Sequence, residues 1–297
     1  MSTVLEIKEL SKNYGTIKAI DKLNFKVEKG MVFGILGPNG SGKTTTLGIL
    51  LGVLNPSGGE FSWFGNGQDY ENRKRIGALL ETPNFFPYLN AVKNLRIVAK
   101  IKDLDNVDDR IDRVLKQVNL FERKDTAFKT FSLGMKQRLA IASALMSDPE
   151  VLVLDEPTNG LDPQGIAEIR NLIIEIAKEG KTILIASHQL DEIEKVCSDV
   201  VILKKGVVIA QDNVENITSG SKQMIIQADD AEKIKAIIDK FDGIEIVKEN
   251  QGQFMLSVQE QINAADVNKY FFDNGVILSE LRLSKKTLEQ QFLEMTK

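Results

Sequence analysis

Residues 37–44 combine glycine, lysine and threonine at a spacing that suits phosphate binding. The run reads GPNGSGKT and fits the pattern G-x-x-x-x-G-K-[ST]. Its glycines let backbone N–H groups turn inward around phosphate oxygens, and the helix that follows points its positive end at them. Lys43 can supply a cation to the β and γ phosphates of a nucleotide, and the Thr44 hydroxyl can bind Mg²⁺. The run therefore predicts a nucleotide-binding loop, here named the phosphate loop; the alternative is an ordinary glycine turn before a helix.

Two adjacent acids, Asp155 and Glu156, directly follow the apolar run at 151–154. That run predicts a buried strand, so both carboxylates would project from its carboxyl end, the edge where open α/β sheets bind ligands. Asp155 is expected to hold Mg²⁺, directly or through water. Glu156 is expected to orient or deprotonate an attacking water. The alternative is a pair of solvated carboxylates in a loop.

Ser132 and Gly134 precede a helical pattern at 135–145. Uncapped N–H groups beside a serine hydroxyl make a ready anion site, although an ordinary N-cap would use the same residue types. His188 is the only histidine of the chain and follows a predicted buried strand at 182–186. A lone histidine is more often a packed or surface residue than a catalytic one, so its neighbours decide its interpretation.

Three runs in this order resemble the motifs of the ATP-binding cassette (ABC) ATPases: the phosphate loop, FSLGM from Phe131 and DEPTNGLDP from Asp155. The resemblance covers about residues 3–212. It implies ATP hydrolysis with Mg²⁺, Thr44 and Asp155 as metal ligands, and Glu156 as a catalytic residue. It also implies a set of nucleotide-binding residues, in which Tyr14 stacks on adenine: Tyr14, Gly37, Pro38, Asn39, Gly40, Ser41, Gly42, Lys43, Thr44 and Thr45. For Tyr14 the alternative is packing within a turn.

The resemblance further implies a head-to-tail dimer of two ATPase subunits. In such proteins the segment at Ser132 and Gly134 binds the γ-phosphate held by the other subunit's phosphate loop. The family usually has LSGGQ there, and this chain has Leu133 and Met135 in place of the first glycine and the glutamine. The loop at 159–162 would meet the partner subunit. His188, within ASHQLDE, resembles the switch histidine that contacts the γ-phosphate, and is expected to be catalytic.

Glu81 departs from the family pattern, which has a glutamine that contacts the metal and its water. A carboxylate is a hard oxygen ligand suited to Mg²⁺, so Glu81 is expected to serve as a metal ligand and to assist catalysis. The same replacement resembles ATPases that serve exporters of bacitracin-like and lantibiotic peptides. The apolar residues that follow, Phe85, Phe86 and Tyr88, are expected to receive a membrane permease subunit; the alternative is that they pack only against each other.

Composition narrows the class of protein. The net charge of −4 gives no whole-chain attraction to nucleic acid, so no nucleic-acid partner is expected. No apolar run approaches the roughly 18 residues of a membrane span, and the first residues lack a signal-peptide pattern. We therefore expect a cytoplasmic protein, peripheral on the inner face of the membrane through a separate permease. The single cysteine, Cys197, excludes an internal disulfide and is expected to be a packed thiol.

Strand and helix patterns alternate along the first two thirds of the chain, which predicts an α/β fold. The family resemblance makes this a P-loop ATPase core with a mainly parallel sheet, an N-terminal antiparallel β-subdomain and a helical subdomain. Strands are predicted at 3–9, 18–28, 32–36, 60–64, 151–154 and 182–186, with a hairpin at 200–203 and 207–210. Helices are predicted at 44–54, through most of 85–147, and after the acids, with Ile166, Ile169, Ile173 and Ile176 on one face.

A change in composition near residues 213–222 predicts a domain boundary. We expect an ATPase domain at 1–215, with its helical subdomain at about 85–147, and a small α+β domain at 222–297. The predicted order in the second domain is strand, helix, strand, strand, helix, strand, which suits a ferredoxin-like module, followed by a terminal helix at 285–295. This domain has no paired acids and no His or Cys cluster, so no chemistry is assigned to it.

The predicted function is that of an ATP-hydrolysing subunit of an ABC transporter that powers export. One alternative is a soluble ABC ATPase that acts on nucleic acid or ribosomes. Such proteins usually carry two cassettes or a long coiled coil, whereas only about fifty residues separate Glu81 from Ser132, and they contain no heptads. The other alternative is a non-hydrolysing regulator, against which the full set of Lys43, Asp155, Glu156 and His188 argues.

Overall fold

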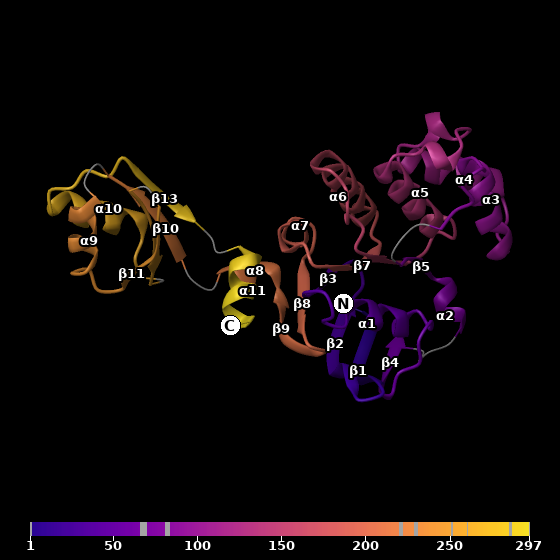
Figure 1. The fold of residues 1–297 in the computed structure, drawn as a ribbon, viewed down its shortest axis with the longest axis horizontal. Helices are drawn as coiled ribbons and strands as arrows, with labels where there is room; N and C mark the ends of the chain where they lie inside the picture. The colour runs from indigo at the N-terminus through magenta and orange to yellow at the C-terminus, as the bar shows by residue number, and fades with distance from the viewer. Residues whose placement is uncertain are drawn as a thin grey trace. The chain divides into compact units, whose positions relative to one another are not determined.

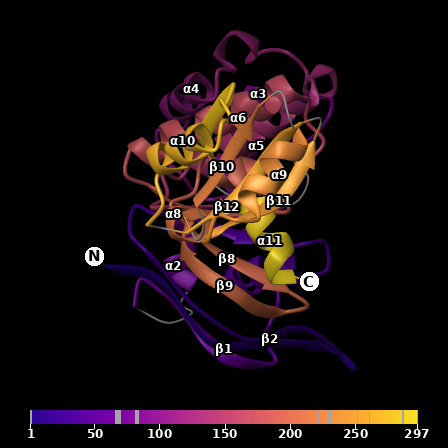
Figure 2. The ribbon, with the colours of Figure 1, turned by 90° about the vertical axis from the view of Figure 1, so that its left-hand side faces the viewer.

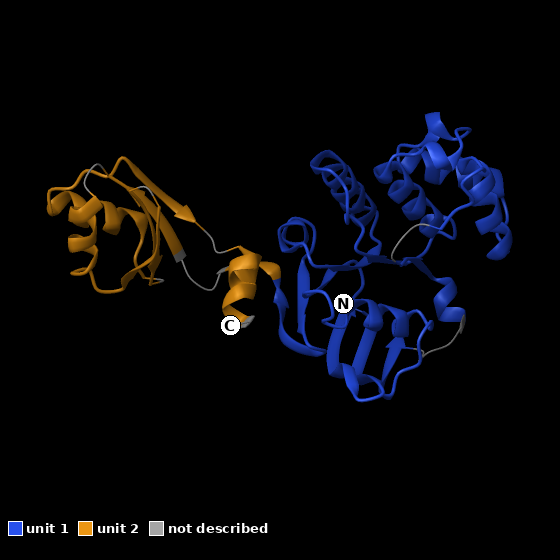
Figure 3. Ribbon diagram, in the orientation of Figure 1, with its two compact units in different colours: residues 1–213 blue, residues 214–297 orange. Residues whose placement is uncertain are grey.

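The computed structural model describes residues 2–65, 70–80, 84–219, 222–228, 231–250, 252–259, 261–284 and 287–296. The chain divides into two compact units, residues 1–213 and 214–297, named the N-terminal and C-terminal units (Figure 3). None of the described helices is both long enough and apolar enough to cross a lipid bilayer.

A six-stranded sheet forms the centre of the N-terminal unit, in the order β5-β6-β7-β3-β8-β9. Neighbouring strands are parallel except β8 and β9, which form the predicted antiparallel hairpin (Figure 2). All residues of β3, β6 and β7 are buried, as expected for parallel strands covered on both faces. The strands are β3 (Val32–Leu36), β5 (Ile76–Leu79), β6 (Val151–Asp155), β7 (Thr182–Ser187), β8 (Asp199–Lys204) and β9 (Val207–Asn213).

Helices and a second sheet cover this central sheet (Figure 1). Helices α6 (Pro163–Lys178) and α7 (Leu190–Glu194) lie on one side, while α1 (Lys43–Leu50) and an antiparallel sheet lie on the other. The antiparallel sheet has the order β2-β1-β4, with β1 at Thr3–Tyr14, β2 at Ile17–Glu28 and β4 at Gly58–Trp63. Its inner residues join the main core, where the buried Trp63 donates from Nε1 to the Leu50 carbonyl (2.9 Å).

The segment between β5 and β6 is mainly helical, as predicted. It contains α3 (Ala91–Ile101), α4 (Val107–Gln117), two short 3₁₀ helices (Phe121–Arg123 and Phe128–Thr130) and α5 (Leu133–Leu145); a short α2 (Tyr70–Lys74) precedes β5. Asn90 caps α3 by accepting from the Lys93 backbone N–H (2.9 Å). The buried face of α4 contains Ile111, Val114 and Leu115, and the following Val118 is buried as well.

The C-terminal unit contains a four-stranded antiparallel sheet in the order β11-β12-β10-β13. With two helices between the strands, this is the order of a split βαβ module. Its own core includes Met224, Phe254, Leu256 and Phe271. The elements are α8 (Val214–Ser219), β10 (Lys222–Gln227), α9 (Ala231–Ile238), β11 (Ile244–Asn250), β12 (Gln253–Val258), α10 (Ala264–Asp273), β13 (Glu280–Ser284) and α11 (Leu288–Thr296), which packs on α8.

The predicted architecture, an α/β core with a mainly parallel sheet followed by a small α+β part, is confirmed. Several predicted boundaries are wrong. Strand β1 runs to Tyr14 rather than to residue 9, because its pairing with β2 continues to Tyr14 opposite Ile17. Helix α1 ends at Leu50 rather than at residue 54, because Gly52 leaves the helical conformation with a φ of +75°. The sequence pattern after Gly275 predicts a last strand at 276–282, but the strand begins at Glu280. Gly275 (φ +72°) and the bond from Val276 N–H to the Phe271 carbonyl first close α10.

Candidate active site

The phosphate loop lies between the carboxyl end of β3 and the first turn of α1. At two positions of the loop, both the backbone conformation and a close backbone neighbour require glycine. A Cβ on Gly37 would clash with the carbonyl oxygen of Leu203, and a Cβ on Gly42 (φ +104°) would come 2.7 Å from that of Ala19. The tip formed by Pro38, Asn39 and Gly40 is exposed, so the loop is accessible to a ligand.

Lys43 lies below this loop and is only 6% exposed. Its Nζ donates to the carbonyl oxygens of Gly37 (2.8 Å) and Pro38 (3.4 Å) and lies 3.5 Å from Glu156 Oε1. The Ser41 hydroxyl of the same loop is buried and has no hydrogen-bond partner among the described residues. A buried polar atom in this condition is uncommon and fits a loop built around a polar ligand.

Glu156 reaches Lys43 through an unusual backbone conformation. Its φ of +48° lies in the left-handed region, where a residue other than glycine costs of order 1 kcal/mol or more. Its backbone N–H donates to the Ala186 carbonyl (2.9 Å), which ties the turn after β6 to β7. The conformation turns the carboxylate away from the strand direction and toward the carboxyl ends of β3 and β7.

His188 completes a group with Lys43 and Glu156. Its Nδ1 lies 2.8 Å from Glu156 Oε2, which also lies 3.4 Å from both the His188 backbone N–H and the Ser187 hydroxyl. Each carboxylate oxygen of Glu156 therefore has its own partners, Lys43 on Oε1 and the Ser187–His188 segment on Oε2. Three segments far apart in the sequence meet here, and they bring a cation, a carboxylate and an imidazole to one edge of the sheet.

Thr44 and Asp155 are the residues expected to hold Mg²⁺. Thr44 is exposed on the first turn of α1, and Asp155 is 1% exposed at the end of β6, against which α1 packs. No group of three or more His, Cys, Asp or Glu side chains within the described residues could hold a metal alone. A hydroxyl and a carboxylate fit Mg²⁺, which proteins commonly bind through one or two side chains together with substrate phosphates.

Ser132 and Gly134 lie at the start of α5, and no hydrogen bond or ion pair in the described structure joins them to Lys43, Glu156 or His188. Ser132 is an N-cap, since its Oγ accepts from the Met135 backbone N–H (3.2 Å). The side chain of Leu133 is 46% exposed and lies beside Gly160, where an added Cβ would be 3.3 Å from Leu133 Cδ2. Within one chain Ser132 therefore acts as an ordinary N-cap. The start of α5 is exposed, so a second chain could contact it.

Tyr14 and the aromatic run at 85–88 make no hydrogen bond or ion pair to Lys43, Glu156 or His188 in the described structure. Tyr14 is 48% exposed at the end of β1, with Lys12 Nζ 5.1 Å from its ring centroid. Glu81 lies outside the described residues. Phe85 packs edge-on against Phe128 (5.1 Å between centroids), whereas Phe86 and Tyr88 contact each other and stay 47% and 69% exposed. Cys197 is buried as predicted, and burial, followed by the charge of Asp199, raises the pKa of its thiol.

Two residues without a predicted role lie next to the group. The Thr158 hydroxyl donates to the side-chain oxygen of Gln189 (2.9 Å), and the Gln189 backbone N–H donates to the Ser187 hydroxyl (3.0 Å). Further along, Arg170 of α6 forms an ion pair with Glu192 of α7 (2.7 Å). The position of Thr158, two residues after Glu156 in DEPT, was the only sequence signal that pointed to it.

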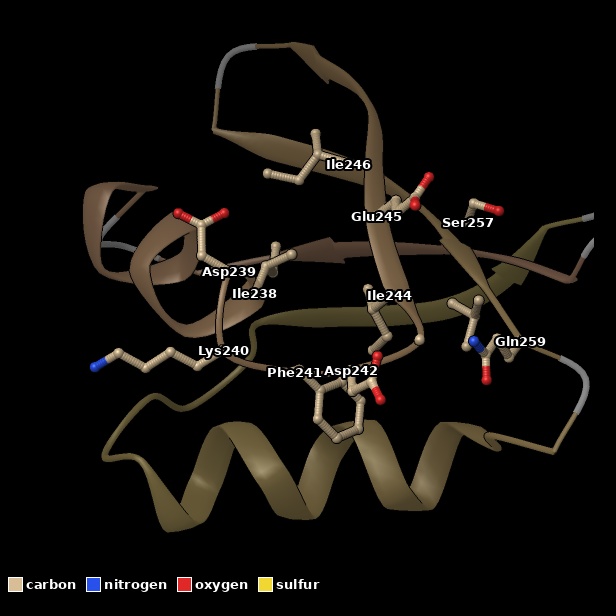
Figure 4. A pocket seen from close by; sticks show the side chains of 12 residues that line it. Ile238, Asp239, Lys240, Phe241, Asp242, Ile244, Glu245, Ile246, Ser257 and Gln259 are labelled. Carbon is tan, nitrogen blue, oxygen red and sulfur yellow. The ribbon is translucent and has the colours of Figure 1, made fainter.

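An open depression of about 840 Å³ lies along β11 in the C-terminal unit (Figure 4). Its wall carries Asp239, Lys240, Asp242 and Glu245, but these side chains point in different directions in the figure rather than toward one point. The ring of Phe241 stacks on Tyr270 (4.2 Å between centroids) and serves the core. We assign no chemistry to this depression.

Comparisons with known proteins agree with the geometry of the N-terminal unit. A family described as "ABC transporter" matches residues 20–159. The bacitracin transport ATP-binding protein BcrA of Bacillus licheniformis is 38% identical over 99% of this chain and 98% of its own length. The lantibiotic transport ATP-binding protein SrtF of Streptococcus pyogenes is 36% identical over 72% of this chain and 94% of its own length.

Solved structures show the same relationship. The structure of cbiO1 from Clostridium perfringens, part of the ABC transporter complex cbiONQ, is 35% identical with a TM-score of 0.69, covering 74% of this chain and 92% of that one. A dimeric post-hydrolysis structure of the ATP-binding cassette MJ0796, bound to ADP and phosphate, is 27% identical with a TM-score of 0.62, covering 70% of this chain and 98% of that one. The resemblance inferred from the three sequence runs is confirmed.

Proposed function

Because this chain belongs to the family of ABC transporter ATP-binding proteins, we propose that it hydrolyses ATP and thereby powers export through a separate membrane permease. The observation that carries the proposal is the meeting of Lys43, Glu156 and His188 directly below the phosphate loop. A regulator that only bound nucleotide would need the loop and Lys43, but it would not need a carboxylate held by an imidazole. The names of the bacitracin and lantibiotic relatives support a transport role.

The residues of this group have distinct tasks in the proposed reaction. Backbone N–H groups of the phosphate loop and Lys43 hold the β and γ phosphates. Mg²⁺, bound by Thr44 and Asp155, would neutralise phosphate charge. A bound γ-phosphate would compete with Glu156 Oε1 for the ammonium group of Lys43. Once released from Lys43, Glu156 Oε1 can accept a proton from the attacking water. His188 keeps hold of Oε2 and contacts the γ-phosphate.

Ser132 and Gly134 are proposed to complete the site of a second ATPase subunit in a head-to-tail dimer. The exposed start of α5 and the absence of any hydrogen bond from these residues to Lys43 or His188, among the residues described, support this. The dimeric cassette among the solved relatives supports it as well. ATP held between two chains would join them, and hydrolysis would part them.

The permease is proposed to dock near Phe85, Phe86 and Tyr88, which places this chain on the inner face of the membrane. Phe86 and Tyr88 support this because their rings remain exposed although they touch each other.

The proposed function is tested by phosphate release from Mg-ATP by the purified full chain. Lys43→Ala should abolish tight ATP binding and turnover, because the phosphates lose their cation. Lys181→Ala is a matched control: Lys181 is also partly enclosed, also bonds an acid (Asp148, 2.8 Å) and a carbonyl, but precedes the amino end of β7. Absence of turnover in the wild type would refute hydrolysis and favour the regulator.

Glu156→Gln should keep ATP binding and slow turnover by about 10²–10⁴-fold, since the amide cannot accept the proton. With Mg-ATP this variant should elute as a dimer in size-exclusion chromatography. A strictly monomeric variant that hydrolyses freely would contradict both the role of Glu156 and the dimer.

Glu81 is proposed to approach bound Mg²⁺ when ATP closes the site, with its carboxylate taking the place of the family's amide. Glu81→Gln should keep most ATPase activity but shift the Mg²⁺ dependence toward higher concentration, and Glu81→Ala should lower turnover further. Identical Mg²⁺ titrations for the three proteins would show that Glu81 does not act on the metal.

A further inference from the structure

The segment that carries His188 is anchored on both sides of the histidine. Ser187 is the last residue of β7, and the Gln189 backbone N–H donates to its hydroxyl (3.0 Å). The Gln189 side chain reaches the other way, where its Oε1 accepts from the Thr158 hydroxyl (2.9 Å). One glutamine therefore connects the end of β7 to the turn after β6.

Thr158 belongs to the same tight turn as Glu156. The Asn159 backbone N–H donates to the Glu156 carbonyl (3.1 Å), and that of Leu161 donates to the Thr158 carbonyl (3.3 Å). Thr158 is 6% exposed, so its hydroxyl has little access to water as an alternative partner. The bond between Thr158 and Gln189 consequently spans the two segments that carry Glu156 and His188.

This bond differs from the direct contacts between those segments. The hydrogen bonds that Ser187 and His188 make to Glu156 all end on Oε2, an atom of the reacting carboxylate. A proton taken up on Oε1 removes the charge of the whole carboxylate, so these hydrogen bonds weaken during the reaction. The backbone bond from the Glu156 N–H to the Ala186 carbonyl (2.9 Å) ends two residues before His188. The Thr158–Gln189 bond contains no reacting atom, so it can persist through the reaction.

Thr158 and the helix that follows Gln189 are both held by neighbouring residues. The cavity beside Thr158 measures about 20 Å³, which is room for about one water. Arg170 and Glu192 hold α7, which begins directly after Gln189, onto α6 (2.7 Å). Burial opposes the charge of Glu192, but hydrogen bonds from Lys195 and Arg170 outweigh it and lower the pKa of that carboxyl.

We propose that Thr158 and Gln189 are positioning residues for ATP hydrolysis: their hydrogen bond keeps the His188 imidazole in register with the Glu156 carboxylate while that carboxylate reacts. This inference rests on the proposed function. Neither side chain bonds to the phosphate loop, so they act on the chemical step and not on nucleotide binding. Misplacement of a catalytic pair by about 1 Å can lower a rate by about 10²-fold.

The test compares kcat and KM for ATP in the full chain and four variants. Thr158→Val keeps the side-chain shape but removes the donor, and Thr158→Ser keeps the donor. Gln189→Met removes the acceptor, and the fourth variant combines Thr158→Val with Gln189→Met. Thr218→Val is the matched control: Thr218 is also 6% exposed and donates to a carbonyl (Val214, 2.9 Å), but it lies in the C-terminal unit.

Thr158→Val and Gln189→Met should each lower kcat about tenfold or more while KM and the melting temperature stay close to those of the control. Thr158→Ser should recover most of the lost rate. The double variant should be no slower than the slower single one, since both remove the same bond.

A wild-type kcat in Thr158→Val would overturn the inference, as would equal rates for the Val and Ser variants or multiplicative losses in the double variant. A rise in KM, or a fall in melting temperature beyond that of Thr218→Val, would show a merely structural role and overturn it too. These results differ from failure of the proposed function, in which the wild type itself releases no phosphate.

Discussion

Single glycines determine the path of the phosphate loop. Gly42→Ala would place a Cβ 2.7 Å from the Ala19 carbonyl oxygen at a φ of +104°, and a backbone carbonyl cannot move aside as a flexible side chain can. We expect the loop to shift and ATP binding to weaken at least tenfold, a change of about 1.4 kcal/mol. Binding of a fluorescent ATP analogue measures this.

Gly180→Ala is the control for that variant. Gly180 has a similar φ (+86°), but an added Cβ would meet nothing within 4 Å. It should lose about 1 kcal/mol of stability from backbone strain and keep its affinity for ATP. Equal affinities in the two variants would contradict the steric explanation.

The burial of the Cys197 thiol can be tested by chemical labelling. The thiol is buried and its pKa is raised by burial and then by Asp199, so both access and thiolate formation are disfavoured. Because the chain has only one cysteine, a thiol-specific chromogenic reagent reports on it alone. The native protein should stay unlabelled at neutral pH, while denatured protein should react stoichiometrically. Fast labelling of the native protein would place Cys197 at the surface.

Helix α6, which begins after the loop at 159–162, is stabilised by an N-cap. The Asp162 side chain accepts from the Gly165 N–H (2.8 Å) and caps α6, with Pro163 in the first turn. Asp162→Ala should destabilise the N-terminal unit by about 1 kcal/mol, which lowers the melting temperature by roughly 2–4 °C. Asp162→Asn keeps a capping oxygen and should melt close to the wild type. Equal losses in both variants would show that charge, and not the cap, stabilises the helix.

Asp162→Asn also tests the expected contact with a partner subunit. Asp162 belongs to the loop at 159–162 that family resemblance places against a second subunit. If its charge serves that contact, Asp162→Asn should lower the ATP-dependent dimerisation of the Glu156→Gln background without lowering its melting temperature.

Among the described residues, each unit has a hydrophobic core of its own. All described residues of the candidate active site lie in the N-terminal unit. Phe254→Ala, at a fully buried ring of the C-terminal core, should cost about 3–5 kcal/mol in that unit and leave ATP turnover at low temperature intact. Phe33→Ala, equally buried in β3, should lower turnover and stability together. Calorimetry and phosphate release distinguish the two, and parallel losses in both variants would show that the units do not unfold separately.

Local sequence was sufficient for features that depend on a few consecutive residues. The phosphate loop, the acids at the end of β6 and most of the strands and helices follow from glycine freedom, turn chemistry and apolar runs, which act over short spans. Strand β5, with only four residues, was not predicted. The resemblance to ABC ATPases rested on the same local runs. Helix ends and strand starts were less predictable, since α1 and β13 are bounded by glycine turns whose conformation depends on nearby contacts.

Which of the predicted site residues contact one another could be seen only in the tertiary structure. The left-handed conformation of Glu156 and the parallel pairing of β3, β6 and β7 bring its carboxylate between Lys43 and His188. Thr158 and Gln189 lie in the sequence runs of Glu156 and His188, but only the structure shows that their side chains share a partly buried hydrogen bond. Distances between residues on separate strands depend on how the strands pair and pack. A short stretch of sequence determines only which local conformations that stretch can adopt.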